Sequence, residues 1–136
     1  MSADRFDPET RSRTMRAVKR RDTTPERVVR RLCWALGTRY RLDVARLPGR
    51  PDLAFHGRRK AIFVHGCFWH GHDCARGARK PKANAAYWSA KIARNRSRDE
   101  KALRDLSAVG YSVLVVWECE TRDVAALEPR LRAFLG

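Results

Sequence analysis

The chain has 136 residues, enough for one domain with its own hydrophobic core, and no apolar run is long enough to span a membrane. Its 30 lysines and arginines exceed its 15 acidic residues, and the net charge of +15 favours a polyanionic partner, nucleic acid above all. The first residues lack the apolar segment of a secretory signal, so we expect a cytoplasmic protein. Its thiols would stay reduced there, which favours metal binding by the cysteines over disulfide formation.

Two helices are predicted before the first strand. The first begins at Asp7-Pro8-Glu9, which supplies an N-cap, a proline and an early acid, and it lies in a basic arm over residues 1–22. This arm is either a solvated face or a DNA-contacting segment, and we favour the second. The next helix begins at Thr24-Pro25-Glu26 by the same logic. Its first-turn Glu26 is expected to compensate the helix dipole, and Cys33 is expected in the core.

Three strands are predicted next, over residues 39–42, 52–55 and 60–64. The third is apolar on both faces and is therefore expected at the centre of a sheet. The second and third form an antiparallel pair, so Asp52 at the start of one should lie beside His65 at the end of the other.

The last three elements are a long helix, a strand and a helix, over residues 85–109, 112–117 and 124–135. The strand is apolar throughout and is expected to be fully buried. The element order predicts a single α/β domain over residues 1–136, with a central mixed β-sheet flanked by helices.

The segment between the third strand and the long helix is rich in metal-binding residue types. Residues 65–74 hold three of the four histidines and two of the four cysteines. Together with one later cysteine, four side chains can form a closed tetrahedral zinc shell, namely Cys67, His72, Cys74 and Cys119. Phe68 and Trp69 would then lie in a pinned loop that has little chance of joining the core. The simpler alternative is a zinc-stapled loop without further function.

Asp52, His65 and His70 are candidates for catalysis. Mg²⁺ prefers oxygen ligands, stabilises charge on a phosphate and orients water, and Asp52 can anchor it. The two histidines ionise near neutrality, so either can act as a general base or acid. Taken singly, each has a purely structural explanation: Asp52 could cap a turn, and His65 could be a hydrogen-bonded histidine at the end of a strand. Residues 53–98 hold eleven lysines and arginines and one acid, so the convergence of Asp52, His65 and His70 on this basic surface favours phosphodiester chemistry.

Residues 47–52, 63–70 and 116–119 resemble the corresponding motifs of the very short patch repair endonucleases, and so does the segment around Met15. The resemblance covers nearly the whole chain. It implies a restriction-endonuclease-like fold with a zinc-stapled loop. It also implies an enzyme that nicks duplex DNA on the 5′ side of the T in a T:G mismatch left by deamination of 5-methylcytosine.

The resemblance further implies roles for particular residues. Asp52 and the backbone carbonyl of Val64 would bind catalytic Mg²⁺, which Glu26 would reach through water. His70 would be the general base, and His65 would assist near the scissile phosphate. The structural Zn²⁺ would be held by Cys67, His72, Cys74 and Cys119. The residues inserted beside the mismatch would be Phe68, Trp69 and Trp88 around the 65–83 loop, and Met15 from the arm.

Two other classes remain open on the sequence. One is a non-catalytic, zinc-stapled DNA-binding module, and the other is a restriction or junction-resolving nuclease of the same fold. For the preferred class we expect a monomer that is associated with the nucleoid through DNA. Contacts with general mismatch-repair proteins follow from the resemblance, and no membrane partner is expected.

Overall fold

The computed structural model describes residues 23–42, 44–72, 74 and 83–136. The predicted arm over residues 1–22, with Met15, lies outside this part. In chain order the elements are α2 (Thr24–Ala35), β1 (Arg41–Leu42), β2 (Leu53–Phe55), the 3₁₀ turn η1 (His56–Arg58), β3 (Lys60–His65), α4 (Ala85–Ala108), β4 (Ser112–Trp117), the 3₁₀ turn η2 (Glu118–Arg122) and α5 (Val124–Leu135).

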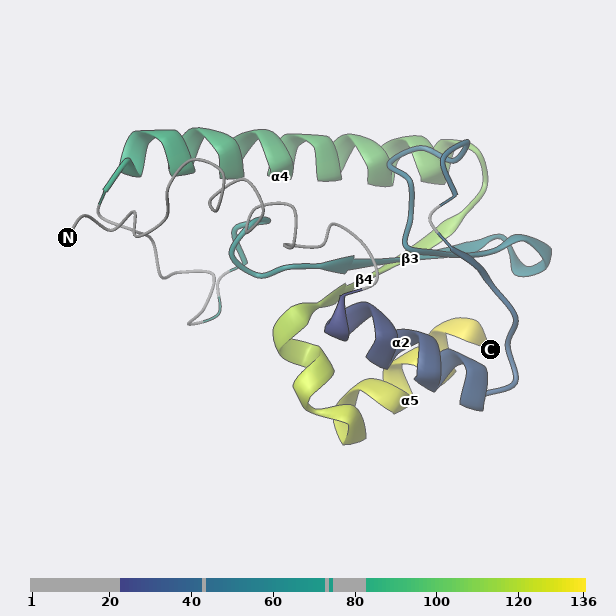
Figure 1. Ribbon diagram of the computed structural model, residues 1–136. Coiled ribbons are helices and arrows are strands. Elements are labelled where there is room, and N and C mark those ends of the chain that lie inside the picture. The colour runs from purple at the N-terminus through teal and green to yellow at the C-terminus, as the bar shows by residue number, and fades with distance from the viewer. Residues whose placement is uncertain (1–22, 43, 73, 75–82) are drawn as a thin grey trace, which may run out of the picture.

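A mixed four-stranded sheet organises these elements, in the order β1-β2-β3-β4 (Figure 1). β1, β2 and β3 pair antiparallel, with Leu53 opposite Ile62, whereas β3 and β4 pair parallel. The central position predicted for the third strand is therefore confirmed.

The prediction that the 112–117 strand is fully buried is wrong. β4 lies at the edge of the described sheet, Ser112 is exposed, and only Val116 of this strand is buried. Apart from Val116, its apolar side chains pack against α4 or the opposite core and stay partly exposed, because no described strand lies beyond them.

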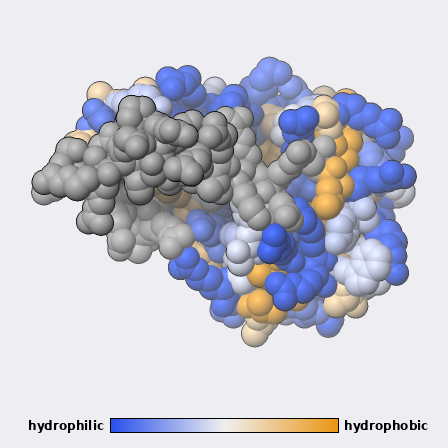
Figure 2. All heavy atoms as spheres, in the orientation of Figure 1, coloured by the Kyte–Doolittle hydropathy of each residue, from blue (hydrophilic) through white to orange (hydrophobic). Residues whose placement is uncertain are grey.

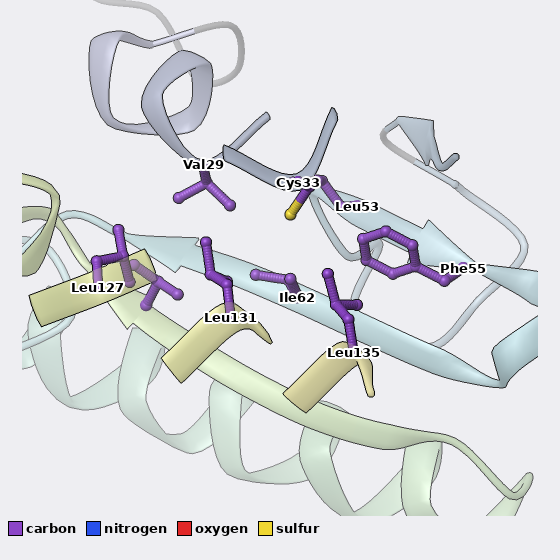
Figure 3. Close-up of a cluster of buried hydrophobic side chains, with 9 residues drawn as sticks. Val29, Cys33, Leu53, Phe55, Ile62, Leu127, Leu131 and Leu135 are labelled. Carbon is purple, nitrogen blue, oxygen red and sulfur yellow. The ribbon is translucent and has the colours of Figure 1, made fainter. Parts of the chain in front are cut away.

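Helices cover both faces of the sheet: α2 and α5 lie on one side and α4 on the other (Figure 1). The larger core lies between the sheet and the α2/α5 pair (Figure 3). Its buried residues are Val29, Cys33, Leu53, Phe55, Ile62, Val116, Leu127, Leu131 and Leu135. The smaller core faces α4 and consists of Ala61, Phe63, Ala102 and Leu106. Side chains alternate along a strand, so β3 supplies residues to both cores and must be apolar on both faces.

Helix α2 begins at the predicted Thr24-Pro25-Glu26, but its N-cap is Thr23, one residue earlier than the sequence suggested. The Thr23 hydroxyl accepts a hydrogen bond from the Glu26 N–H at 3.4 Å, and Pro25 occupies the first turn of α2. Cys33 is fully buried, as predicted, and burial raises the pKa of its thiol to about 12. None of the helices in the described ranges combines the length and the apolar character needed to cross a membrane.

Candidate functional site

A cavity of about 790 Å³ opens between the start of β2, the end of β3 and the middle of α4. Its charged and polar lining includes Arg50, Asp52, His65, His70, Asn95, Arg98 and Asp99, and Val64 contributes to the wall. The structure thus brings together four of the residues that the sequence singled out: Asp52, Val64, His65 and His70.

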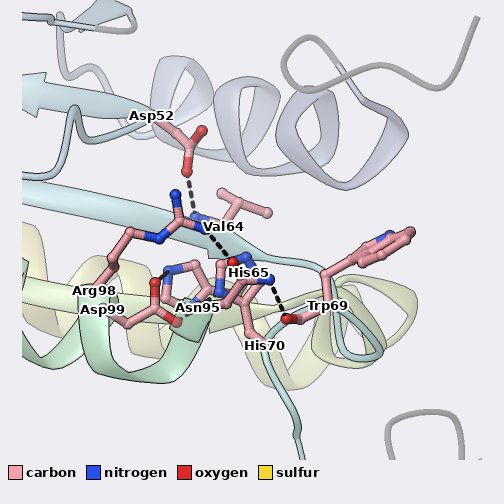
Figure 4. Close-up of polar contacts among 8 residues, drawn as sticks. All are labelled: Asp52, Val64, His65, Trp69, His70, Asn95, Arg98 and Asp99. Carbon is pink, nitrogen blue, oxygen red and sulfur yellow. Dashed lines mark hydrogen bonds and ion pairs between the residues drawn. The ribbon is translucent and has the colours of Figure 1, made fainter. Parts of the chain in front are cut away.

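Asp52 is held at the mouth of this cavity by the strand that it faces. It precedes β2 by one residue, and the β2/β3 register places it opposite Phe63. Its Oδ2 atom accepts a hydrogen bond from the Val64 N–H at 2.6 Å (Figure 4). The Asp52 carboxylate therefore accepts a hydrogen bond from β3, as a backbone carbonyl would if the pairing of β2 with β3 continued. A carboxylate beside a backbone segment in an open cavity supplies the oxygen donors that fit a hard divalent cation.

His65 and His70 stack on one another beside α4. Their ring centroids are 4.0 Å apart and the planes differ by 2°. His65 is 6% exposed, because it lies at the end of β3 on the face that packs toward α4. Burial and the neighbouring His70 lower the pKa of His65 to about 4, against an opposing effect of Asp99. The imidazole of His65 is therefore neutral near pH 7.

Asp99 is a site residue that the sequence analysis missed. Its Oδ2 atom lies 2.6 Å from His70 Nδ1, and its Oδ1 atom lies 3.8 Å from His65 Nε2. The inward stripe of α4 has helical spacing and consists of Ile92, Asn95, Asp99, Ala102 and Leu106. A carboxylate midway between Ile92 and Leu106 on an apolar stripe was the signal that could have identified it.

Asn95 ties the histidine-rich loop to α4. Its side-chain amide donates to the Trp69 carbonyl at 2.7 Å, and its carbonyl oxygen accepts from Arg98 (Figure 4). This link positions the segment that carries His70 and places the Arg98 guanidinium at the cavity wall.

Glu26 does not line the cavity. Its side chain is buried, with 4% of the residue exposed, and Arg30 donates to its carboxylate at 3.3 Å. The geometry therefore shows Glu26 as the buried acid of the first turn of α2.

The Cys/His cluster, consisting of Cys67, His72, Cys74 and Cys119, lies next to the cavity. One donor atom from each residue lies within 4.8 Å of the other three, and none of the four cysteines forms a disulfide. The Cys119 thiol lies 3.6 Å from His72 Nδ1, and its backbone N–H donates to the Cys67 sulfur at 3.4 Å. Burial raises the pKa of the Cys67 thiol to about 12. Three thiols and an imidazole this close fit a tetrahedral cation site, so the cluster could hold a metal ion.

Trp117, the last residue of β4, lies between the cluster and the cavity. Its ring stacks on His72 at 4.2 Å and meets the edge of His65 at 5.2 Å. Because β3 and β4 pair His65 with Trp117 in register, one indole contacts a residue of each site.

The aromatic cluster, consisting of Phe68, Trp69 and Trp88, joins the loop to the start of α4. The ring centroids lie 5.0 to 5.7 Å apart, and the Lys91 ammonium lies 5.0 Å from the Trp69 ring. All three residues are half-buried, and none belongs to either core. The three rings are therefore partly exposed and lie outside both cores. The described residues on the face shown in Figure 2 are mostly hydrophilic.

An arginine-lined cavity with two carboxylates and two stacked histidines offers groups that phosphodiester hydrolysis in a polyanionic substrate can use. A mixed α/β sheet carries this cavity. The fold and the site thus fit a small α/β protein of the hydrolytic nuclease type.

Comparison with known proteins identifies the family. The family model described as DNA mismatch endonuclease Vsr matches residues 3–76. The chain is 49% identical over 132 residues to a Type II nicking enzyme, V.XorIIP, from Xanthomonas oryzae pv. oryzae, across 97% of this chain and 96% of that protein. It is 42% identical over 120 residues to DNA mismatch endonuclease Vsr from Escherichia coli (strain K12), across 88% and 76%. A Type II nicking enzyme from Neisseria meningitidis serogroup A, V.NmeAIP, is 39% identical over 128 residues, across 94% and 91%. The chain therefore belongs to the DNA mismatch endonuclease Vsr family, and this membership supports a DNA endonuclease.

Proposed function

We propose that this protein nicks duplex DNA on the 5′ side of the T in a T:G mismatch and so starts very short patch repair. Family membership supports the class of reaction. The observation that carries the proposal is the hydrogen-bonded pair of His70 and Asp99, which lies in the same cavity as Asp52.

His70 is the general base in this proposal. A carboxylate can only accept a hydrogen bond, so the 2.6 Å contact with Asp99 assigns the proton of a neutral His70 ring to Nδ1. Its Nε2 atom then keeps the lone pair that accepts a proton from water. As the water oxygen bonds to phosphorus, one ester P–O bond of the backbone breaks, and Asp99 stabilises the imidazolium that forms.

The remaining cavity residues bind and orient the substrate. Arg50 and Arg98 provide guanidinium groups for phosphate oxygens, and His65 assists beside the scissile phosphate. Asp52 and the Val64 carbonyl would hold Mg²⁺, which supplies charge stabilisation and a polarised water when bound. That Glu26 contacts this cation through a water molecule stays a prediction, because Glu26 lies outside the cavity lining.

Mismatch selectivity is assigned to the aromatic cluster, with Met15 contributing from the arm. Opening a base step costs a few kcal/mol, and least at a mismatch. Stacking a base on an aromatic ring returns about 1–3 kcal/mol. Insertion is therefore close to neutral at T:G and unfavourable in matched duplex. The half-buried position of Phe68, Trp69 and Trp88 outside both cores supports this assignment.

The Cys/His cluster is assigned to structural Zn²⁺. Thiolate and imidazole ligands favour zinc over magnesium, and four protein ligands leave no open position for a reacting water. Because Cys119 follows β4, the ion would tie the loop to the sheet.

A single assay tests the proposal against the two other classes. Strand-labelled duplexes that are matched, contain T:G or are branched are incubated with the protein and Mg²⁺. The proposal requires one break, in the T strand of the T:G duplex. A non-catalytic module gives no Mg²⁺-dependent break, and a restriction or junction nuclease cuts both strands or the branched substrate.

A nick needs one active site, so we also propose a monomer, together with nucleoid association in the cytoplasm and contacts with general mismatch-repair proteins.

A further inference from the structure

We infer that His65, His70 and Asp99 form a second cation site, which takes borderline transition-metal ions such as Zn²⁺, Co²⁺ or Ni²⁺ and thereby inhibits the nuclease. The site lies within the cavity but is chemically distinct from its Asp52 end. Two imidazoles and one carboxylate suit borderline cations, whereas carboxylate and carbonyl oxygens suit Mg²⁺.

The three donor atoms lie close together. One donor atom from each of the three residues lies within 4.8 Å of the other two. Asp99 bridges the pair, with oxygens 2.6 Å from His70 Nδ1 and 3.8 Å from His65 Nε2. Ligand bonds of about 2.0–2.2 Å at tetrahedral or octahedral angles require donor separations of roughly 3.0–3.5 Å. A cation would therefore widen the His70–Asp99 contact by about 0.4–0.9 Å and shorten the His65–Asp99 contact by about 0.3–0.8 Å.

A buried atom of His65 is a second, independent indication. Its Nδ1 atom has no hydrogen-bond partner among the described residues, in a side chain that is 6% exposed. A buried polar atom without a partner calls for an explanation, and a lone pair that a bound cation would take up is one such explanation. The rings of His65 and His70 are parallel with centroids 4.0 Å apart, so their in-plane lone pairs meet at one cation only after one ring tilts out of the stack.

Occupancy of this site blocks the general base, a step that rests on the proposed function. A cation on His70 Nδ1 takes the lone pair of that atom, so the ring proton must lie on Nε2. Nε2–H cannot accept a proton from water. No proton is gained or lost by the ring, but the tautomer that the reaction requires is removed. Asp99 at the same time binds the cation and no longer stabilises the imidazolium of His70.

The binding test uses the zinc-loaded, full-length protein in millimolar Mg²⁺ without DNA. Co²⁺ is added, and bound metal is measured by equilibrium dialysis and visible absorption. We expect one further Co²⁺ per chain, whose spectrum lacks the thiolate charge-transfer band of cobalt in a cysteine site. Asp99→Ala and His65→Ala should weaken this binding at least about tenfold, since even lost outer-shell partners cost 10- to 100-fold in affinity.

Two matched variants separate this site from its neighbours. His56→Gln changes a histidine that is hydrogen-bonded to Tyr111 outside the cavity, and it should keep the second ion. Asp52→Ala should keep it as well, because Asp52 belongs to the other end. Wild-type protein that binds no second Co²⁺, or ligand variants that are folded by circular dichroism and bind it like wild type, would overturn the inference.

The inhibition arm measures Mg²⁺-supported nicking while Zn²⁺ is added. We expect the rate to fall as the second site fills and to recover with a weak chelator that leaves the structural zinc in place. Nicking that persists with the site filled contradicts the inhibitory role. A T:G nick in a protein that binds no second cation removes this inference alone, whereas a second cation without any nicking removes the proposed function alone.

Discussion

The Nδ1 atom of His70 lies 2.6 Å from the Oδ2 atom of Asp99, although 29 residues separate them in the chain. His70 comes from the loop after β3 and Asp99 from the middle of α4, so the pair forms only when α4 packs across the sheet. This contact fixes the orientation of one imidazole and the position of its proton.

Replacing Asp99 with asparagine should therefore lower the nicking rate about 10²- to 10⁴-fold, the usual contribution of a positioned general base. An amide can donate to Nδ1 and favour the wrong tautomer. Single-turnover nicking and equilibrium binding to T:G duplex separate the effects, because affinity should change little. Asp105→Asn is the control, since Asp105 pairs with Lys101 on the outer face of the same helix. Equal losses in both variants would show that α4 is merely destabilised.

Asp52→Ala should abolish Mg²⁺-supported nicking and keep mismatch binding. In the proposed function its carboxylate anchors a hard cation with few protein ligands, whereas Arg50 and Arg98 of the cavity lining remain to bind phosphate. Nicking and binding are measured on the same T:G duplex over a range of Mg²⁺ concentrations. A rate near that of wild type would place the active site elsewhere.

Cys119→Ala should lose about one zinc per chain and lower the Tm by several degrees, since each ~1 kcal/mol of lost stability corresponds to a few degrees in a domain of this size. Elemental analysis and calorimetry are the measurements. Cys33→Ala is the matched control: it removes a buried thiol from the larger core, so it should lose stability but keep its zinc. Wild-type protein that is stable without zinc would contradict the assignment.

Cys33 should resist alkylation in the folded protein. Alkylation requires the thiolate, and a pKa raised from 9.0 to about 12 by burial lowers the thiolate fraction at every pH below that value. At pH 8 the fraction is ~10⁻⁴, against about a tenth for an unshifted thiol. Peptide mass spectrometry after iodoacetamide treatment should find Cys33 unmodified, with or without a zinc chelator. Chelation should expose the half-buried Cys74 and Cys119 to the reagent. Rapid native labelling of Cys33 would show that the α2 core opens readily.

The double variant Phe68→Ala/Trp69→Ala should fold, keep its zinc and bind DNA, but lose its preference for T:G over C:G. Stacking worth about 1–3 kcal/mol per base is removed, while the basic surface remains. Competition binding must be run at fixed salt, because non-specific affinity depends steeply on salt. Trp34→Ala is the control, as Trp34 is an exposed tryptophan on α2. An unchanged preference in the folded double variant would place mismatch sensing outside this loop.

The periodicity of hydrophobic residues predicted most of the fold, because it follows which face of each helix and strand is buried. The strand over 112–117 and the helix over 124–135 have the predicted bounds. The first strand is shorter than predicted, since only Arg41 and Leu42 pair with β2. Apolar content alone does not distinguish an edge strand packed on one side from a central one, which is why the burial of β4 was overestimated.

The candidate site was predictable where it depends on neighbouring strands. Antiparallel pairing places Asp52 near the end of β3, and the spacing of the Cys/His residues suggested their cluster. Asp99 was not found, because its role depends on how α4 crosses the sheet. Asp99 lines the cavity without having been predicted, whereas Glu26 was named as a candidate and is buried with Arg30, away from the cavity lining.

Parallel strands β3 and β4 can pair only after residues 66–111 have been made and α4 has crossed the sheet. A ribosome adds about 5–20 residues per second, so His65 and His70 emerge seconds before Trp117 and Cys119. During that interval the loop lacks its last thiol, and the histidines lack the indole that separates them from it. A chain that ends before β4 thus lacks the parallel partner of β3 and the fourth member of the Cys/His cluster, and the fold is complete only once the last strand of the sheet is in place.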